Sequence, residues 1–281
     1  MAYKSVLTVA TNAPKVPAIL RDASALCRNQ DAHLSILALG VDTLQVGYAY
    51  VGASAGLMQV ALEQVEDAAR AIETAVHIAV AAEQQILQWD VEAAVTQLGA
   101  LTEIVAQKAR FADLVILPKP YGPRIGAEAE AVVEAVLFEG QAPVLVLPDE
   151  GLGPLPIEQV VIAWNQSREA MVATRRAMPF LRAAESVTIA VIDPPHHGVE
   201  RADPGGALCQ MLVRHGVKAE ISVLPRSQPR ISDVLNQKVL DMNAGLLVMG
   251  AYGHSRFREA VMGGATRSML EQMVVPVLMA H

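Results

Sequence analysis

Short apolar runs alternate with longer amphipathic stretches along the whole chain. Runs of about four to eight Val, Ile, Leu and Ala residues predict buried strands, and apolar residues at helical spacing between them predict helices. This alternation is typical of βαβ units and therefore of a parallel sheet. Strands are predicted near 4–10, 33–39, 85–92, 113–117 and 143–148, and again near 159–164, 186–192, 218–224, 245–249 and 276–280.

Helices are predicted in the segments between these strands. One of them, from about 57 to 82, is unusually long, and its apolar face is expected to cover the sheet of the first half. Those of the second half are predicted near 167–183, 205–216, 229–243 and 264–274.

The chain repeats itself once. Three apolar segments of the first half recur in the same order in the second: 3–10 matches 157–164, 113–117 matches 245–249, and 142–147 matches 275–280. An ordered set of matches indicates a duplication. We therefore predict two tandem, doubly wound, five-stranded parallel α/β domains.

The segment 149–156, which reads Asp-Glu-Gly-Leu-Gly-Pro-Leu-Pro, separates the two halves. Its Gly and Pro residues cannot continue a helix or a central strand. The predicted domains are accordingly residues 1–150 and 155–281.

Charge is distributed unevenly over the 281 residues. The net charge of −7 and the aromatic content of 4% argue against a nucleic-acid partner. Residues 1–150 carry nine Lys and Arg against eighteen Asp and Glu, net −9, whereas residues 151–281 carry thirteen against eleven, net +2. The second half is therefore the better candidate for binding an anion.

The cysteines and the apolar runs indicate the compartment. Cys27 and Cys209 form neither a CxxC pair nor a metal-ligand spacing. No signal peptide precedes the first strand, and no apolar run approaches the roughly 18 residues of a membrane helix. We expect a soluble, reduced, cytoplasmic protein without a membrane partner.

A glycine-rich segment follows the strand predicted at 245–249. Gly250-x-x-Gly253 is followed, after nine residues, by Gly263-Gly264-Ala265-Thr266 at the start of a helix. Glycines let the backbone approach an anion, and a helix N-terminus supplies free N–H groups and a positive dipole end. Cationic side chains lie in the same stretch, at His254, Arg256, Arg258 and Arg267. The alternative is that the glycines serve only tight turns and the packing of helix against sheet.

This spacing, with Leu246-Leu247-Val248-Met249 before it and Pro276-Val277-Leu278 after it, resembles the ATP-binding signature of the universal stress protein family. The duplicated chain is similar to a tandem member of that family. The resemblance implies that residues at two strand ends contact adenine and ribose and that the glycine segment surrounds ribose and phosphates. The implied nucleotide-binding residues are Ala163, Trp164, Asn165, Val191, Gly250, Gly253, His254, Arg256, Gly263, Gly264, Ala265 and Thr266.

Two positions depart from the family pattern. Asn165 stands where nucleotide-binding members usually have Asp, which removes a negative charge that could hold ribose or a metal. Gly264 stands where Ser or Thr is usual, which removes one phosphate-binding hydroxyl. The ligand implied is ATP, ADP or AMP, with or without Mg²⁺.

The first half lacks the signature. It reads Pro118-Lys119-Pro120-Tyr121-Gly122-Pro123 where the second has its glycines, and its next helix begins with Glu128 and Glu130. Prolines have no N–H to offer a phosphate, and carboxylates repel it. Thr11 stands where the family has Asp. We predict that the first half has lost the nucleotide site.

No catalytic or metal-ligating residue is identified. His196 and His197 lack a third ligand at a recognisable spacing and suit a solvated loop. The resemblance implies a stress-response regulatory module that binds ATP or ADP in its second half. The alternatives are an ATP-hydrolysing or nucleotidyl-transferring enzyme of the same fold group, and a scaffold that binds no nucleotide.

The closing strand of each half is apolar and is predicted to lie at a sheet edge, where it needs a cover. In the family this edge pairs domains about a two-fold axis. The resemblance therefore implies that the two halves form a pseudo-two-fold pair within one chain, with a homodimer as the other arrangement. The protein partner is not indicated by the sequence.

Overall fold

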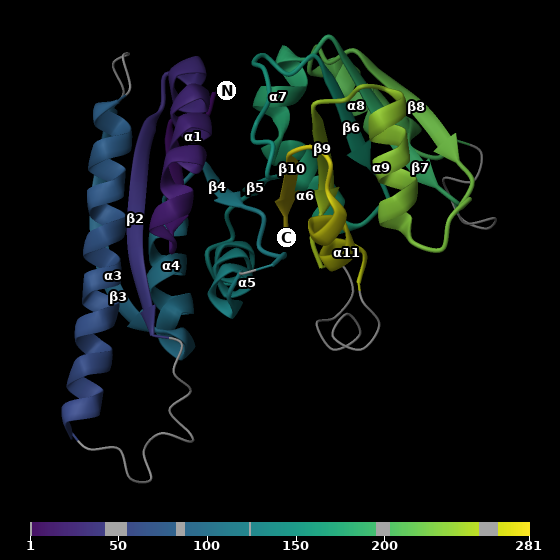
Figure 1. The fold of residues 1–281 in the computed structure, drawn as a ribbon. Coiled ribbons are helices and arrows are strands. Elements are labelled where there is room, and N and C mark those ends of the chain that lie inside the picture. The colour runs from purple at the N-terminus through teal and green to yellow at the C-terminus, as the bar shows by residue number, and fades with distance from the viewer. Residues whose placement is uncertain (1, 43–54, 83–87, 124, 195–202, 253–263) are drawn as a thin grey trace. The chain divides into compact units, whose positions relative to one another are not determined.

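The computed structural model describes residues 2–42, 55–82, 88–123, 125–194, 203–252 and 264–281. The chain divides into two compact units, Ala2–Ala142 and Pro143–His281. Each unit contains a sheet with helices packed against it (Figure 1).

The first unit has four parallel strands in the order β3-β2-β1-β4. Helices α1 and α3 pack side by side, and α4 packs beside α5, as expected when crossovers cover both faces of a sheet. The strands are β1 (Ser5–Ala10), β2 (His33–Asp42), β3 (Gln88–Gln97) and β4 (Leu114–Pro118). The helices are α1 (Val16–Gln30), α3 (Ala55–Ala81), α4 (Leu101–Ala109) and α5 (Ala127–Glu134), with short turns η1 (Ala13–Lys15), η2 (Leu98–Ala100) and η3 (Ala135–Glu139).

The second unit has six strands in the order β5-β10-β9-β6-β7-β8. All of its described pairs are parallel except that of β5 and β10. The strands are β5 (Val144–Leu147), β6 (Gln159–Ala163), β7 (Ser186–Ile192), β8 (Ala219–Leu224), β9 (Leu246–Gly250) and β10 (Val277–Ala280). The helices are α6 (Arg168–Arg176), α7 (Met178–Ala183), α8 (Gly206–Arg214), α9 (Ile231–Asp241) and α11 (Ala265–Gln272).

Aliphatic side chains on the central strands form the core of each unit. Every residue of β5 and β10 is buried, as are most residues of β1, β4 and β9. Strands covered on both faces need apolar residues at successive positions, which explains why these runs do not alternate. The buried hydroxyl of Thr8 on β1 donates to the Ile116 carbonyl at 2.8 Å, so this polar group is satisfied inside the core.

The prediction of two tandem, doubly wound α/β halves is confirmed, and most element boundaries agree within a few residues. The strand predicted at 85–92 was placed too early, because β3 lies at a sheet edge and its half-exposed residues carry a weak apolar pattern. The helix predicted at 167–183 is two helices. They meet at Ala177, because Pro179 in the first turn of α7 has no N–H to continue the helical ladder.

The compact units divide before β5, whereas the sequence predicts the division after it, at 149–156. The cause is the partner of β5: Leu145 pairs with Leu278, and Val146 with Val277, in antiparallel register with β10. The closing runs of the two sequence repeats therefore pair with each other, while the pseudo-two-fold arrangement of the halves stays a prediction.

None of the helices in the described part of the chain combines the length and the apolar character needed to cross a membrane.

The pairing of β5 with β10 can be tested with a double-mutant cycle. Leu145 and Leu278 are paired in register and fully buried. We expect Leu145→Ala and Leu278→Ala each to lower the free energy of unfolding by about 2–5 kcal/mol in urea denaturation. The double variant should lose less than the sum by about 0.5–2 kcal/mol, because each substitution removes contacts that the other also removes.

Leu212 on α8 provides the matched control, since its side chain is also fully buried. Helix α8 packs against β8, which lies at the opposite end of the second unit's strand order from β5. Leu145→Ala combined with Leu212→Ala should be additive. Equal coupling in the two cycles would contradict the assigned register.

Candidate functional site

The carboxyl ends of β6 and β9 lie side by side in the second unit. Strand β6 has β9 on one side and β7 on the other, with Ala163 level with Met249 and with Ala190. The Trp164 N–H extends the ladder by donating to the Ala190 carbonyl at 2.9 Å. The chain reverses its direction of winding between β6 and β9, and open α/β sheets bind ligands at such a switch point.

Asn165 shapes the turn that leads from β6 into α6. Its Oδ1 accepts a hydrogen bond from the Ser167 N–H at 3.1 Å, and the Ser167 hydroxyl oxygen caps α6 by accepting from the Ala170 N–H at 3.1 Å. Gln166 between them has a left-handed φ of 64°. The Asn165 side chain is exposed and is bonded within this turn, so the amide has a local structural role in addition to the ligand role predicted for it.

Gly250 ends β9 directly beneath the first turn of α6. A Cβ built on Gly250 would lie 2.5 Å from the Ala170 nitrogen and 2.8 Å from the Glu169 carbonyl carbon. No side chain fits there, because the obstacle is helix backbone. Close helix packing thus accounts for a glycine at this position independently of any ligand.

The first residues after β9 are held from two directions. The Ala251 N–H donates to the Ala280 carbonyl at 2.9 Å, and the Tyr252 N–H donates to Thr266 Oγ1 at 3.1 Å. Tyr252 has a left-handed φ of 54°, and Thr266 on α11 is buried. His281 Nδ1 lies 3.0 Å from the Ala251 carbonyl oxygen. These bonds join the start of the glycine segment to α11 and to the residue that follows β10.

The structure brings part of the predicted site together. Gly264 caps the N-terminus of α11, Ala265 is its exposed first residue, and Val191 is buried at the end of β7. Gly253, His254, Arg256 and Gly263 lie outside the described residues. Sequence analysis missed Ser167 and His281. A Ser before a helical segment is a recognisable cap signal, whereas nothing in the sequence marks His281.

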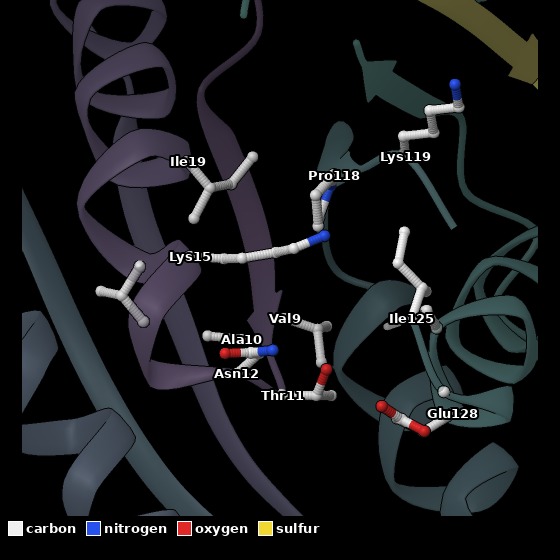
Figure 2. Close-up of a pocket in the computed structure, with 13 residues that line it drawn as sticks. Val9, Ala10, Thr11, Asn12, Lys15, Ile19, Pro118, Lys119, Ile125 and Glu128 are labelled. Atoms are coloured by element: carbon white, nitrogen blue, oxygen red, sulfur yellow. The ribbon is translucent and has the colours of Figure 1, made fainter. Parts of the chain in front are cut away.

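The first unit has a small pocket at the equivalent strand ends, between β1, η1 and α5 (Figure 2). Figure 2 shows the Lys15 side chain extended across this pocket toward Pro118. Its volume is about 40 Å³, far below the roughly 300–1,000 Å³ of typical ligand sites.

Two carboxylates stand at the start of α5 in this unit. The Glu128 carboxylate folds back over Gly126, the N-cap of α5, so closely that a Cβ there would overlap it. Glu130 accepts a hydrogen bond from the Tyr121 hydroxyl at 2.6 Å. The N-terminus of α5 therefore faces the Glu128 carboxylate.

Within the ranges that the structure describes, no three His, Cys, Asp or Glu side chains gather as metal ligands would. His196 and His197 lie outside those ranges.

No protein-family model and no curated protein matches the chain. Several solved structures do match the chain. The chain resembles a universal stress protein from Archaeoglobus fulgidus DSM 4304, with a TM-score of 0.66 and 15% identity over 98% of this chain and 96% of that one. It also resembles a putative universal stress protein from Pseudomonas aeruginosa UCBPP-PA14, with a TM-score of 0.59 and 16% identity over 99% of this chain and 93% of that one.

A third structure, a protein of unknown function from Pseudomonas aeruginosa PAO1, matches with a TM-score of 0.56 and 14% identity over 99% of this chain and 92% of that one. The fold of the universal stress proteins therefore extends over nearly the full length of this chain, and the resemblance found in the sequence is confirmed at the level of the fold.

The packing at Gly250 predicts a large effect for a small substitution. Gly250→Ala would push a methyl group into the α6 backbone, and we expect it to lower the free energy of unfolding by about 1–3 kcal/mol. Gly99→Ala is the control, because nothing lies within 4 Å of a Cβ there and its φ is not positive. Thermal and urea unfolding should show Gly99→Ala close to the unsubstituted protein. Equal stability of the two variants would refute the contact.

Proposed function

We propose that the second unit binds an adenine nucleotide at the carboxyl ends of β6 and β9, and that the protein acts as a stress-response regulatory module. The observation that carries the proposal is the position of residues 250–252, with which the glycine segment begins. They lie at a topological switch point, and Thr266 and His281 tie them to α11 and to the residue that follows β10. The universal stress protein fold over the whole chain supports the same assignment.

The balance of charged residues favours the second unit, rather than the first, as the one that binds the nucleotide. Residues 151–281 carry thirteen Lys and Arg against eleven Asp and Glu, and the first-unit pocket is small and faced by the Glu128 carboxylate. A polyphosphate is attracted by an unopposed helix N-terminus and repelled by a carboxylate placed there. One nucleotide per chain is therefore expected.

A binding role is favoured over catalysis, since the residues at the end of β6 include no general base or nucleophile. The side chains at the strand ends are Ala163, Trp164 and Asn165, and none of them titrates near neutral pH. Cys27, which lies on α1 of the first unit, is a buried free cysteine. Burial raises the pKa of its thiol to about 12, so it stays protonated.

Titration calorimetry with ATP and ADP tests the proposal directly. We expect one site per chain in the unsubstituted protein and no binding by Gly263→Asp, because the added carboxylate would lie in the segment assigned to phosphate. Gly99→Ala, in the other unit, should bind as the unsubstituted protein does. If the unsubstituted protein binds neither nucleotide, the result would favour the alternative of a scaffold that binds no nucleotide. If the protein steadily releases phosphate from ATP, the result would favour the alternative of an ATP-hydrolysing enzyme.

Asn165→Asp tests the role of the missing charge. Asp keeps the Oδ1 acceptor that the Ser167 N–H requires, so the turn should survive while a negative charge appears at the strand end. We expect ATP binding to become severalfold tighter with Mg²⁺ than without it, as measured by calorimetry. Thr11→Asp, the corresponding change in the first unit, should add no second site. An affinity unchanged by Asn165→Asp, with or without Mg²⁺, would remove Asn165 from the site.

A further inference from the structure

A surface concavity lies along the exposed side of α4 in the first unit. Its volume is about 640 Å³, within the roughly 300–1,000 Å³ of typical binding pockets. The lining residues are Gly99, Ala100, Thr102, Glu103, Ala106, Gln107, Arg110 and Glu139. Gly99 and Ala100 form one end, and nothing lies within 4 Å of a Cβ built on Gly99. This small-residue end of the concavity therefore has room for a bulky side chain.

Phe111 holds an aromatic ring in solvent next to the concavity. It directly follows Arg110 and is 81% exposed, the highest value among the large apolar residues of the described chain. Single exposed aliphatic side chains are ordinary on protein surfaces. A ring offers more apolar area, and both Phe and Arg are enriched in protein interfaces. Covering Phe111 with a partner surface would therefore favour association.

Residues of opposite charge stand two turns apart on the exposed face of α4. Glu103, Gln107 and Arg110 recur at helical spacing, and all three are exposed. The Arg110 Nε donates to the Glu139 carbonyl oxygen at 3.3 Å, which holds the guanidinium beside the end of η3. One end of this face is therefore negative and the other positive, about 10 Å apart along the helix.

A two-fold axis at the middle of the α4 face brings unlike charges together. When two copies of a helix pack antiparallel about such an axis, residues equally far from it on opposite sides face each other. Glu103 and Arg110 are equally far from the point between Ala106 and Gln107. Each copy therefore places its Arg110 opposite Glu103 of the other copy, and the ion pair forms twice.

The same axis carries the exposed ring to the open end of the concavity. Phe111 lies one residue beyond Arg110, so it meets the other copy at the level of Thr102, one helical turn from Gly99. Gly99 and Ala100 have no side chain large enough to block a ring there. Each copy therefore buries one Phe111 ring against the other.

We propose that two copies of the chain associate through the α4 face, with Phe111 of each copy in the concavity of the other and Arg110 paired with Glu103 across the axis. A two-fold interface requires a surface that complements itself, and this face combines a ring with a hollow and a cation with an anion. Strands β5 and β10 already pair within one chain, so association of two chains needs another surface. The α4 face belongs to the first unit and the proposed nucleotide site to the second, so the two proposals can fail separately.

Sedimentation equilibrium of the full chain, over about a hundredfold range of concentration, tests the association. We expect the unsubstituted protein to shift from monomer to dimer as its concentration rises. Phe111→Ser should raise the dissociation constant by roughly tenfold or more, because each copy loses a buried ring. Ile78→Ser is the matched control, since Ile78 is 67% exposed on α3 of the same unit but lies outside the α4 face. It should dimerise as the unsubstituted protein does.

Charge reversal tests the pairing across the axis. Arg110→Glu and Glu103→Arg each place like charges opposite each other twice, so each should weaken the dimer by roughly tenfold or more. The double variant restores unlike pairs with the charges exchanged, and its dissociation constant should return to within a few-fold of the unsubstituted value. Both residues are exposed, so urea denaturation should show all these variants folded with nearly unchanged stability.

Three results would overturn the inference. An unsubstituted protein that stays monomeric at every concentration would exclude the dimer. A dimer that Phe111→Ser leaves as tight as before would place the interface on another surface. A double variant that associates as weakly as the two single charge variants would refute the antiparallel pairing of Arg110 with Glu103.

Discussion

The contact between Gly250 and the first turn of α6 is the constraint on which the arrangement of the second unit depends. Helix backbone lies so near this strand end that only a residue without a side chain can be there. The contact places the Asn165–Ser167 turn at the end of β9 and sets where the following segment leaves the sheet. The candidate site is therefore built on close packing between a helix and a strand.

The same fold produces different strand ends in the two units. In the second unit β9 ends in Gly250, and Thr266 anchors the segment that follows. In the first unit β4 ends in Pro118, which has no N–H, and the Glu128 carboxylate occupies the space in front of α5. If the second unit binds a nucleotide as proposed, a few residues at strand ends are enough to keep a site in one copy and fill it in the other.

Much of the fold and part of the site follow from local sequence signals. Runs such as Leu246–Gly250 can be recognised because strands covered on both faces must be apolar throughout. The edge strand β3 was placed poorly, since half of its residues face solvent and lack that pattern. The bond between His281 and the Ala251 carbonyl could not be foreseen, because it joins residues 30 positions apart whose types carry no signal.

The sequence by itself determined the duplication, the parallel α/β class and the half that carries the glycine segment, because each depends on periodicity or on composition within a short window. Tertiary structure alone decided that β5 pairs with β10, that Gly250 serves helix packing, and that the Trp164 N–H is buried with no hydrogen-bond partner among the described residues. Pairing, close approach and burial are properties of atoms brought together from distant parts of the chain. No local pattern of residues encodes which groups will meet.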